Sequence, residues 1–452
     1  MVEKRQSIHG LWSSRWAFIL AATGAAVGLG NIWKFPYMVG QNGGAAFVAI
    51  YLLSMVFIGI PLLMTEIALG RCGRQNPANT LSTIAQENNL KPAWRLVGMI
   101  IVCAGPAILI YYCVIAGWTL AYVVKATLGQ FTGITAAEAK QLFETFIASP
   151  WQLLLYHSIV TFATIFVVAK GIEHGIEKVV NFMFPGMLFI LAVLVGYGIN
   201  SGHFQEAVVY LFQPDFSELT SQSFLLAMGQ AFFSLSIATG SIIMYGAYLP
   251  RGTSVTGCAV TIALADTGVA LLAGLAIFQE VIGNQLEPGM GPGLIFETLP
   301  IALGKMSWGN LFAFLFFVML IFAAFTSTIS LLEPGVAYLI ETRKYSRIRA
   351  AIILGGIIWL FGIVTILSFN HWQELRLFGK NFFELLDYLT ANLMLPIAGL
   401  LLVIFTGWRI KREFIRQELQ LQDRFLFRCW YFVIRYIAPL SIIIVFLKSM
   451  GL

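Results

Sequence analysis

Residues 21–36 read AATGAAVGLGNIWKFP, an apolar segment interrupted by three glycines, an asparagine, a lysine and a proline. A glycine costs about 1 kcal/mol relative to alanine inside a helix, so the run Gly-Leu-Gly-Asn has little to keep it helical. We therefore expect a local unwinding of the helix at this run. The alternative is that Gly24 and Gly28 form a small-residue face for helix packing, and this segment alone leaves both interpretations open.

The segment belongs to a chain of 452 residues in which 58% are hydrophobic and only 11% are charged. An ordinary soluble domain carries about 25% charged residues, so a multi-pass membrane protein is expected. A run of about 20 apolar residues crosses a bilayer as a helix and is too long for a barrel strand. The sequence therefore predicts an all-α integral membrane protein with eleven transmembrane helices. The eleven apolar segments are residues 14–35, 44–69, 96–124, 152–169, 179–199, 224–248, 255–281, 308–340, 348–368, 382–408 and 429–447.

The charges of the connecting loops are unevenly distributed. With the N-terminus placed inside, most of the 28 lysines and arginines fall in cytoplasmic loops. Such an excess indicates orientation in a lipid bilayer, because positively charged loops stay on the cytoplasmic side. We expect a cytoplasmic N-terminus, a C-terminus outside after eleven crossings, no cleaved signal peptide and no nucleic-acid partner. Five scattered cysteines predict packing residues, with neither a disulfide framework nor a metal site.

A second interruption lies in the sixth segment, where residues 229–248 read GQAFFSLSIATGSIIMYGAY. The hydroxyls of Ser234, Ser236 and Thr239 can replace lost backbone partners, although such hydroxyls commonly bond back to their own helix. The sixth segment follows the first by five, and because five is odd, equivalent helices of the two halves run in opposite directions. Inverted repeats of this kind place a binding site between paired broken helices at the membrane midplane. Free N–H groups suit a carboxylate and free carbonyls suit an ammonium or Na⁺, so the pair suits a zwitterion.

Several ionisable residues fall at membrane depth. An ionised Asp266 costs about 3 kcal/mol or more without a partner, so it requires a cation or a proton. Glu66 and Glu333 are interpreted as structural hydrogen-bonding groups. Lys34 and Asp387, near the outer ends of the first and tenth segments, either pair across a vestibule or extend to water.

Hydroxyl groups gather in the eighth segment, where residues 322–334 read FAAFTSTISLLEP. Adjacent hydroxyls beside small residues suit Na⁺, a hard cation that prefers oxygen ligands, although packing is the commoner role of such a cluster. In the third segment, a buried hydroxyl of Tyr111 or Tyr112 needs a polar partner, which is either a neighbouring carbonyl or a ligand carboxylate.

Two other classes of protein fit these features less well. A channel needs a polar stripe along its helices, whereas the polar residues here gather at the two breaks. An intramembrane enzyme needs a nucleophile beside a base, and none of the five histidines stands in an obvious register with one. We therefore expect no enzymatic activity.

Five longer motifs resemble the neurotransmitter:sodium symporter family, and the resemblance covers nearly the whole chain. The eleven apolar segments of the chain are similar to those of bacterial amino-acid members of the family that lack a twelfth helix. The broken-helix rule is known partly from this family, so the resemblance and the rule are not independent. The motifs are GLGNIWKFPYMVGQNGGAAF (28–47), GIPLLMTEIALGR (59–71), KGIEHGIEKVVNFMFP (170–185), GQAFFSLS (229–236) and GPGLIFETLP (291–300).

The resemblance implies a leucine-transporter-type fold with a 5+5 inverted repeat, in which helices 1 and 6 are broken. It implies a first repeat at residues 1–199 and a second at 200–408. The turn-forming and acidic residues of 200–223 and 284–300 themselves predict two structured outer loops, either of which is a candidate to cap a vestibule. Residues 409–452 would form helix 11. The implied function is secondary active transport in the bacterial inner membrane, with Na⁺-coupled symport of an amino acid by alternating access.

The resemblance also implies two sodium sites and one substrate site between the broken helices. The first sodium would meet the Ala26 carbonyl, Asn31, Ser234 and Asp266, and the second the carbonyls of Gly24, Val27 and Ala323 with the hydroxyls of Thr326 and Ser327. The substrate residues would be Ala25, Ala26, Gly28, Leu29, Gly30, Ile108, Tyr112, Phe233, Ser234, Ser236, Ile237, Thr239, Ser327 and Leu331. The gate residues would be Lys34, Asp387 and Phe233 outside, and Arg5, Trp12, Tyr248 and Glu341 inside, with Arg5 as the basic partner.

The chain departs from the family pattern at Lys34, at Ala238 with Thr239, and at the inner gate, where the basic partner is not clearly aligned. Lys34 stands where arginine is usual, which predicts a looser outer gate because lysine lacks the bidentate fork. Ala238 replaces a small glycine of the second break, and Thr239 replaces a bulky apolar residue, which predicts a larger or more polar pocket. Asp266 provides a carboxylate beside the first sodium, which predicts chloride-independent uptake. The substrate stays open, with a non-amino-acid amine as the alternative, and so does the oligomeric state.

Overall fold

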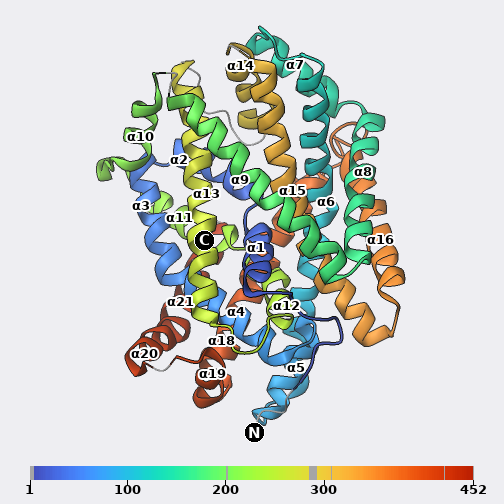
Figure 1. The fold of residues 1–452 in the computed structure, drawn as a ribbon, viewed down its shortest axis with the longest axis vertical. Coiled ribbons are helices and arrows are strands. Elements are labelled where there is room, and N and C mark those ends of the chain that lie inside the picture. Colours follow the sequence, from blue (N-terminus) through green and yellow to red (C-terminus); the bar gives the residue numbers. More distant parts are fainter. Residues whose placement is uncertain (1–4, 200–201, 285–292, 307, 422, 451–452) are drawn as a thin grey trace.

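The computed structural model describes residues 5–199, 202–284, 293–306, 308–421 and 423–450, and shows a bundle of helices (Figure 1). Parts of the predicted regions lie outside this range: residues 1–4 of the first repeat, residues 200–201 and 285–292 of the outer loops, residue 307 of the second repeat, and residues 422, 451 and 452 of helix 11. Short 3₁₀ or π turns are labelled η. The first half contains α1 (Arg15–Ala26), η1 (Gly30–Lys34), α2 (Phe35–Gln41), α3 (Gly44–Ser54), η2 (Met55–Gly59), α4 (Ile60–Gly73), α5 (Pro77–Glu87), η3 (Pro92–Trp94), α6 (Arg95–Thr127), α7 (Ala136–Ile147), α8 (Pro150–Ala169), η4 (Ile172–Glu177) and α9 (Lys178–Ile199).

The second half repeats this pattern of long apolar helices joined by short ones. Its elements are α10 (Phe204–Phe212), η5 (Phe216–Glu218), α11 (Ser221–Ser234), α12 (Ser241–Ala247), α13 (Val255–Gly283), η6 (Leu294–Thr298), α14 (Leu299–Gly304), α15 (Gly309–Arg343), α16 (Arg347–Leu367), α17 (Phe382–Asp387), η7 (Tyr388–Met394), α18 (Leu395–Ile404), η8 (Phe405–Arg409), α19 (Arg412–Leu419), α20 (Arg424–Phe432), η9 (Val433–Ile437) and α21 (Ala438–Ser449).

Among the described residues, nine helices are long and apolar enough to cross a membrane, or ten if one bent pair is counted as a single span. The bent pair is Arg15–Ala26 with Gly30–Gln41. The two halves of the predicted sixth segment, α11 and α12, are each too short to cross alone, because a crossing takes about 20 residues. The count of eleven crossings therefore stays a prediction.

The first span is interrupted at the glycine-rich run. α1 ends at Ala26, η1 begins at Gly30, and the two parts meet at an angle of 53°. Val27 takes an extended conformation, with φ of −69° and ψ of 110°. The unwound run leaves backbone N–H and carbonyl groups outside the regular helical ladder.

The sixth segment is interrupted between Ser234, where α11 ends, and Ser241, where α12 begins. Ser236 and Ala238 have φ of 52° and 65°, in the left-handed region that non-glycine residues rarely enter. The Ala238 N–H donates to the Glu66 carboxylate at 2.6 Å. A carboxylate on a neighbouring helix thus holds the break open, and the interpretation of Glu66 as a structural hydrogen-bonding group agrees with this contact.

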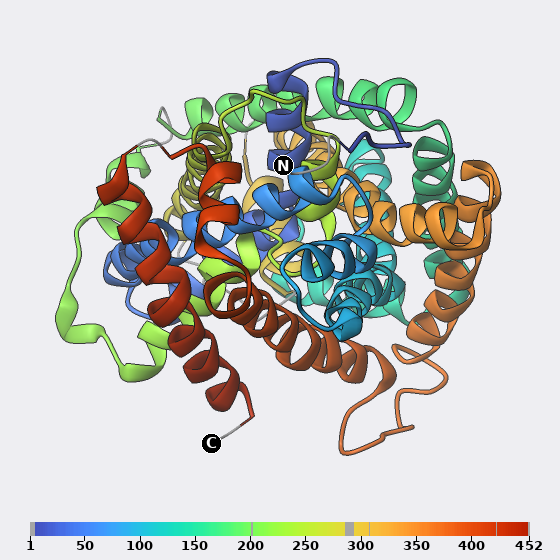
Figure 2. The ribbon, with the colours of Figure 1, turned by 90° about the horizontal axis from the view of Figure 1, so that it is seen from below.

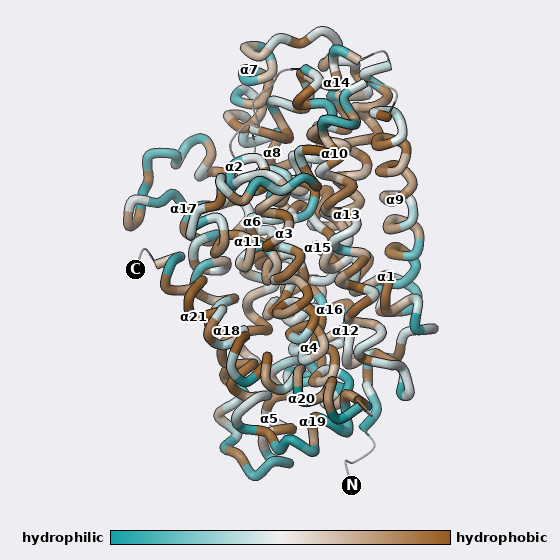
Figure 3. Tube along the Cα trace, turned by 90° about the vertical axis from the view of Figure 1, so that its left-hand side faces the viewer, coloured by the Kyte–Doolittle hydropathy of each residue, from teal (hydrophilic) through white to brown (hydrophobic). Residues whose placement is uncertain are grey.

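The bundle centres on α15, which packs against α1, α6, α8, α9 and α16. Apolar residues dominate the middle of the molecule, and hydrophilic residues concentrate toward its two ends (Figure 3). α5 and α19 lie at one end, and α7 and α14 lie at the other (Figure 1). We call these the inner and outer ends, following the predicted orientation. Of the cysteines expected to be packing residues, Cys103 and Cys429 are exposed instead, and Cys72, Cys113 and Cys258 are buried.

Candidate functional site

The two interrupted spans face each other inside the bundle. The Ser236 hydroxyl donates to the Ala25 carbonyl at 2.8 Å, so the second break contacts the last turn of α1. Gln230 of α11 donates from Nε2 to the Gly30 carbonyl at 3.2 Å. The Phe233 ring covers Gly30 so closely that an added Cβ would lie 3.3 Å from it. Backbone groups of both spans thus border one interior region.

Asn31, Ser234 and Asp266, three of the four residues predicted for the first sodium, form one buried cluster. Asn31 Nδ2 lies 2.8 Å from Asp266 Oδ1 and 3.3 Å from Ser234 Oγ, and the Ser234 hydroxyl donates to the Asp266 carboxylate. All three side chains are buried, and Asp266 points into the bundle. Tyr51 of α3, which the sequence reasoning missed, brings its hydroxyl within 3.4 Å of Ser234 Oγ.

The residues predicted for the second sodium lie where α15 meets the first break. The Ser327 hydroxyl is 3.4 Å from the Val27 carbonyl and 3.2 Å from the Ala323 carbonyl. The Thr326 hydroxyl donates to the Ala323 carbonyl at 3.1 Å. A Cβ added at Gly24 would lie 3.4 Å from Thr326. Carbonyl and hydroxyl oxygens from α1 and α15 therefore converge at this position.

The other two hydroxyls of the eighth segment point elsewhere. Thr328 pairs with the Thr164 hydroxyl of α8 at 2.8 Å, and Ser330 donates to the carbonyl of Ser327 at 2.9 Å. The alternative that such hydroxyls serve packing therefore holds for these two residues.

The predicted substrate region lies between the two polar clusters. The Tyr112 hydroxyl accepts a hydrogen bond from the Leu29 N–H at 3.3 Å. A Cβ at Gly28 would come within 2.7 Å of the Ser327 hydroxyl and 3.0 Å of the Tyr112 hydroxyl, so only glycine leaves this space free. The remaining predicted lining residues are all buried: Ala25, Ile108, Ile237 and Leu331.

Thr239 contributes less polarity to this region than its identity suggests. Its hydroxyl donates to the Ser236 carbonyl at 2.7 Å and lies 3.2 Å from the Ser241 hydroxyl. The hydroxyl is therefore bonded to the broken backbone. Tyr111 behaves similarly, because its hydroxyl pairs with Thr390 at 3.3 Å.

The outer end of the region is covered by Phe233 and Lys34. Lys34 Nζ lies 4.3 Å from the centroid of the Phe233 ring. Among the described residues, no ion pair joins Lys34 to Asp387. A cavity of about 270 Å³ lies beside them, and its lining residues are Lys34, Met38, Gln222, Leu225, Leu226, Gly229, Gln230, Phe232, Phe233, Ala391, Asn392, Leu395, Pro396, Val445, Lys448 and Ser449.

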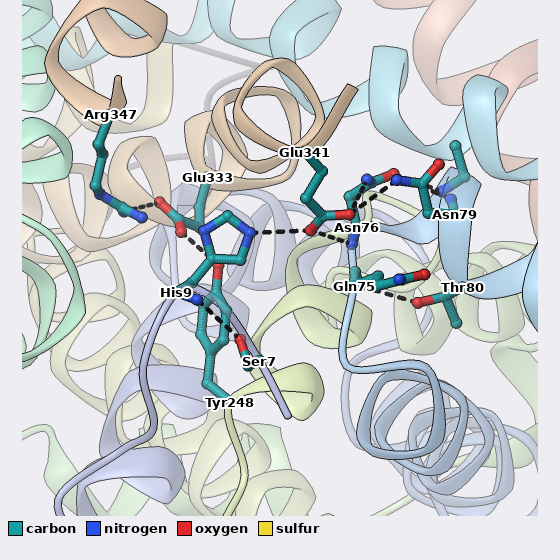
Figure 4. Close-up of polar contacts among 11 residues, drawn as sticks. Ser7, His9, Gln75, Asn76, Asn79, Thr80, Tyr248, Glu333, Glu341 and Arg347 are labelled. Atoms are coloured by element: carbon teal, nitrogen blue, oxygen red, sulfur yellow. Dashed lines mark hydrogen bonds and ion pairs between the residues drawn. The ribbon is translucent and has the colours of Figure 1, made fainter. Parts of the chain in front are cut away.

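The inner end is closed by the segment that precedes α1. Trp12 is buried, its N–H donates to the Tyr248 carbonyl at 3.0 Å, and its indole Nε1 donates to the Tyr245 carbonyl at 3.0 Å. Glu333 accepts a hydrogen bond from the Tyr248 hydroxyl at 2.6 Å and also pairs with Arg347 (Figure 4). The interpretation of Glu333 as a structural hydrogen-bonding group agrees with these contacts.

Glu341 is the centre of the inner closure, but its basic partner is His9 and not Arg5. His9 Nε2 lies 2.9 Å from the Glu341 carboxylate (Figure 4). The same carboxylate accepts from the Asn76 backbone N–H at 2.8 Å and from Asn79 Nδ2 at 2.9 Å. Arg5 pairs with Glu87 instead. The expectation for Arg5 was wrong because the chain turns between residues 5 and 9, and an extended N-terminal segment has no periodicity that indicates which side chain points inward.

Comparison with known proteins finds matches over almost the whole chain. The model of the sodium:neurotransmitter symporter family matches residues 9–135 and 129–451. An uncharacterized sodium-dependent transporter of Bacillus subtilis, YhdH, is 37% identical over 98% of both chains, and an uncharacterized sodium-dependent transporter of Haemophilus influenzae is 31% identical over 97% of this chain and 98% of its own.

A solved structure, that of MhsT in complex with L-phenylalanine, is similar over 97% of this chain and 99% of its own, with 39% identity and a TM-score of 0.89. Sequence and structural similarity over almost the entire chain leave no large part of this protein unmatched. The chain therefore belongs to the neurotransmitter:sodium symporter family.

Proposed function

We propose that the protein is a Na⁺-coupled symporter of an amino acid that works by alternating access. The observation that carries the proposal is the meeting of two interrupted spans beside a buried Asp266. Free peptide groups of the breaks can hold both ends of a zwitterion, and a buried carboxylate needs a cation. The similarity to MhsT, whose structure contains L-phenylalanine, supports an amino acid as the substrate class.

In this proposal the chain divides its polar groups among three ligands. The substrate carboxylate meets the N–H groups of Leu29 and Gly30 and the Tyr112 hydroxyl, and the ammonium meets carbonyls at Ala26, Phe233 and Ser234 with help from Ser236. One Na⁺ binds the Ala26 carbonyl, Asn31, Ser234 and Asp266. The second binds carbonyls of Gly24, Val27 and Ala323 and the hydroxyls of Thr326 and Ser327.

The charge balance of these ligands gives uptake an electrical direction. Two Na⁺ ions with a zwitterion carry net positive charge inward past a fixed Asp266 carboxylate. Each elementary charge gains about 2.3 kcal/mol per 100 mV of membrane potential, so uptake is electrogenic. The same carboxylate supplies the negative charge beside the first Na⁺, so no chloride is required.

In the proposed orientation, the N-terminus lies in the cytoplasm and the C-terminus outside the inner membrane.

A thermal-stability screen of the purified protein tests the proposal. Each of the common amino acids is added in NaCl, in KCl and in sodium gluconate, because a ligand that binds only the folded state raises the unfolding temperature. We expect at least one amino acid to stabilise the protein in both sodium salts and not in KCl. The Asp266→Asn variant should lose that sodium-dependent shift, whereas Glu87→Gln, at the inner surface, should keep it.

Three results of this screen would count against the proposal. Stabilisation by amino acids in KCl would show that substrate binding does not require sodium. Stabilisation only in NaCl would contradict chloride independence. No response to any amino acid, with a response to a non-amino-acid amine in sodium, would replace the substrate class.

A further inference from the structure

A polar cavity lies at the inner end, outside the transport pathway. It has a volume of about 490 Å³ and lies between α19 and α20. In Figure 1 α19 and α20 lie at the lower left of the bundle, and in Figure 2 the red C-terminal helices run along one side of it. The lining residues of the cavity are Arg412, Glu413, Arg416, Arg424, Phe427 and Arg428.

The charge of this cavity is strongly positive. Four of its six lining residues are arginines, and Glu413 is the one acid among them. Glu413 lies 3.7 Å from Arg416, one turn away on the same helix. Within the described part of the chain, Arg412, Arg424 and Arg428 form no ion pair with a carboxylate. An anion in this cavity would therefore meet at least three guanidinium groups that have no acidic partner.

Aromatic rings hold some of these guanidinium groups in place. The Arg412 guanidinium lies 5.4 Å from the Phe427 ring centroid and 5.1 Å from the Tyr431 centroid, and Arg416 lies 5.9 Å from that of Phe427. Phe427 itself is buried. A guanidinium over a ring keeps its N–H donors available at the edge, which suits bidentate recognition of phosphate oxygens.

The surface next to the cavity is apolar. Phe425, Leu426 and Phe432 of α20 are 64%, 54% and 54% exposed. Trp408 and Tyr436, 51% and 49% exposed, lie against each other with ring centroids 5.7 Å apart. Exposed aromatic residues beside a row of arginines are typical of the level where lipid headgroups meet acyl chains. A soluble anion would need the arginines but not this apolar border.

We propose that the cavity between α19 and α20 binds the phosphate headgroup of an anionic phospholipid of the cytoplasmic leaflet. The arginines of the cavity hold the phosphate oxygens, and the exposed side chains of α20 contact the acyl chains. The site is separate from the substrate and sodium sites. It rests on the proposed orientation of the chain in the membrane and not on the proposed transport function.

Hydrogen bonds of Arg71 connect α19, beside the proposed lipid site, to the closed inner end. Arg71, at the end of α4, donates from Nε to Glu418 of α19 at 2.6 Å and from Nη1 to the Thr253 carbonyl at 2.5 Å. Thr253 lies in the loop between α12 and α13. A lipid that steadies α19 therefore also steadies the loop that follows the second broken span, so lipid binding should raise the stability of the folded protein.

Thermal unfolding of the purified full-length protein in detergent tests the site. The protein is titrated with phosphatidylglycerol, with phosphatidylcholine and with inorganic phosphate. We expect phosphatidylglycerol to raise the unfolding temperature at concentrations where the other two ligands do not. In the Arg424→Gln/Arg428→Gln variant, the half-saturating concentration of phosphatidylglycerol should rise about tenfold or more, because each basic residue near an anionic surface contributes substantially to binding.

The matched control is the Lys91→Gln/Arg95→Gln variant, which removes the same charge from two exposed residues near the inner end. Its half-saturating concentration should change less than about twofold. If the double variant is unstable without lipid, Arg424→Gln alone replaces it, since Arg424 makes no side-chain hydrogen bond within the described residues. Equal losses in the variant and the control would overturn the site in favour of general surface charge, and an equal response to inorganic phosphate would overturn the lipid assignment.

Discussion

The two ends of the transport pathway are closed by different means. At the inner end, Glu341 accepts hydrogen bonds from three different residues of the N-terminal segment and α5 region, and Trp12 is buried beneath them. At the outer end, Lys34 lies over the Phe233 ring beside an open cavity of about 270 Å³. Directional contacts therefore hold the inner end shut, whereas the outer end has a single aromatic cover. The difference suggests that opening inward costs more than opening outward.

Removal of the Glu341 carboxylate should have the largest effect. Glu341→Ala leaves His9, Asn76 and Asn79 without their shared acceptor, and hydrogen bonds to a charged group contribute about 1.5–3 kcal/mol each. We expect amide hydrogen exchange in residues 8–14 to accelerate more than tenfold and uptake to fall. Glu87→Gln, which removes the partner of Arg5, should change exchange less than about twofold. Unchanged exchange in Glu341→Ala would show that the inner end does not depend on this carboxylate.

A smaller effect should distinguish His9 from Arg5 as the basic residue of the inner gate. His9→Ala removes one of several donors to Glu341, and a typical hydrogen bond contributes about 0.5–1.5 kcal/mol. The same exchange measurement should show an acceleration of roughly twofold to tenfold in His9→Ala and little change in Arg5→Ala. The reverse order would restore the expectation drawn from the sequence.

The smallest effect should come from tightening the outer end. Lys34→Arg supplies a fork that can reach Asp387, and a partly exposed pair of this kind contributes about 0.2–1 kcal/mol. We expect the apparent affinity for substrate to change by no more than about fivefold, measured by concentration-dependent uptake. The change should disappear in the Lys34→Arg/Asp387→Asn double variant. A change that persists there would show that arginine acts through Phe233 and not through Asp387.

Composition and length were enough to predict the long helices. The predicted segment 255–281 corresponds to α13 (Val255–Gly283), and segment 348–368 corresponds to α16 (Arg347–Leu367), because an apolar run of this length has few alternatives to a helix. Short π turns such as η7 and η9 were not predictable, since they arise from a one-residue shift in backbone hydrogen bonding that leaves no compositional signal.

The candidate site was predictable where chemistry and helix breaks coincide, as at Asp266 and Ser234. Tyr51 and His9 were missed for different reasons. Tyr51 lies in a uniformly apolar helix, where nothing in the sequence shows which side faces Ser234. His9 precedes the first helix, so its position depends on how the N-terminal segment folds over Glu341. The roles of the predicted site residues in binding, like the limits of the two repeats, stay predictions.

The second break has a consequence for how the molecule can rearrange. Ser236 and Ala238 have left-handed backbone conformations. Such a conformation costs a residue other than glycine roughly 1–2 kcal/mol. The Ala238 N–H donates a hydrogen bond to the Glu66 carboxylate, which holds this residue in place. A backbone confined in this way has few neighbouring conformations to visit. We therefore expect the peptide groups at the centre of this span to keep their orientation when α11 and α12 change their tilt, so that the break would serve as a fixed pivot.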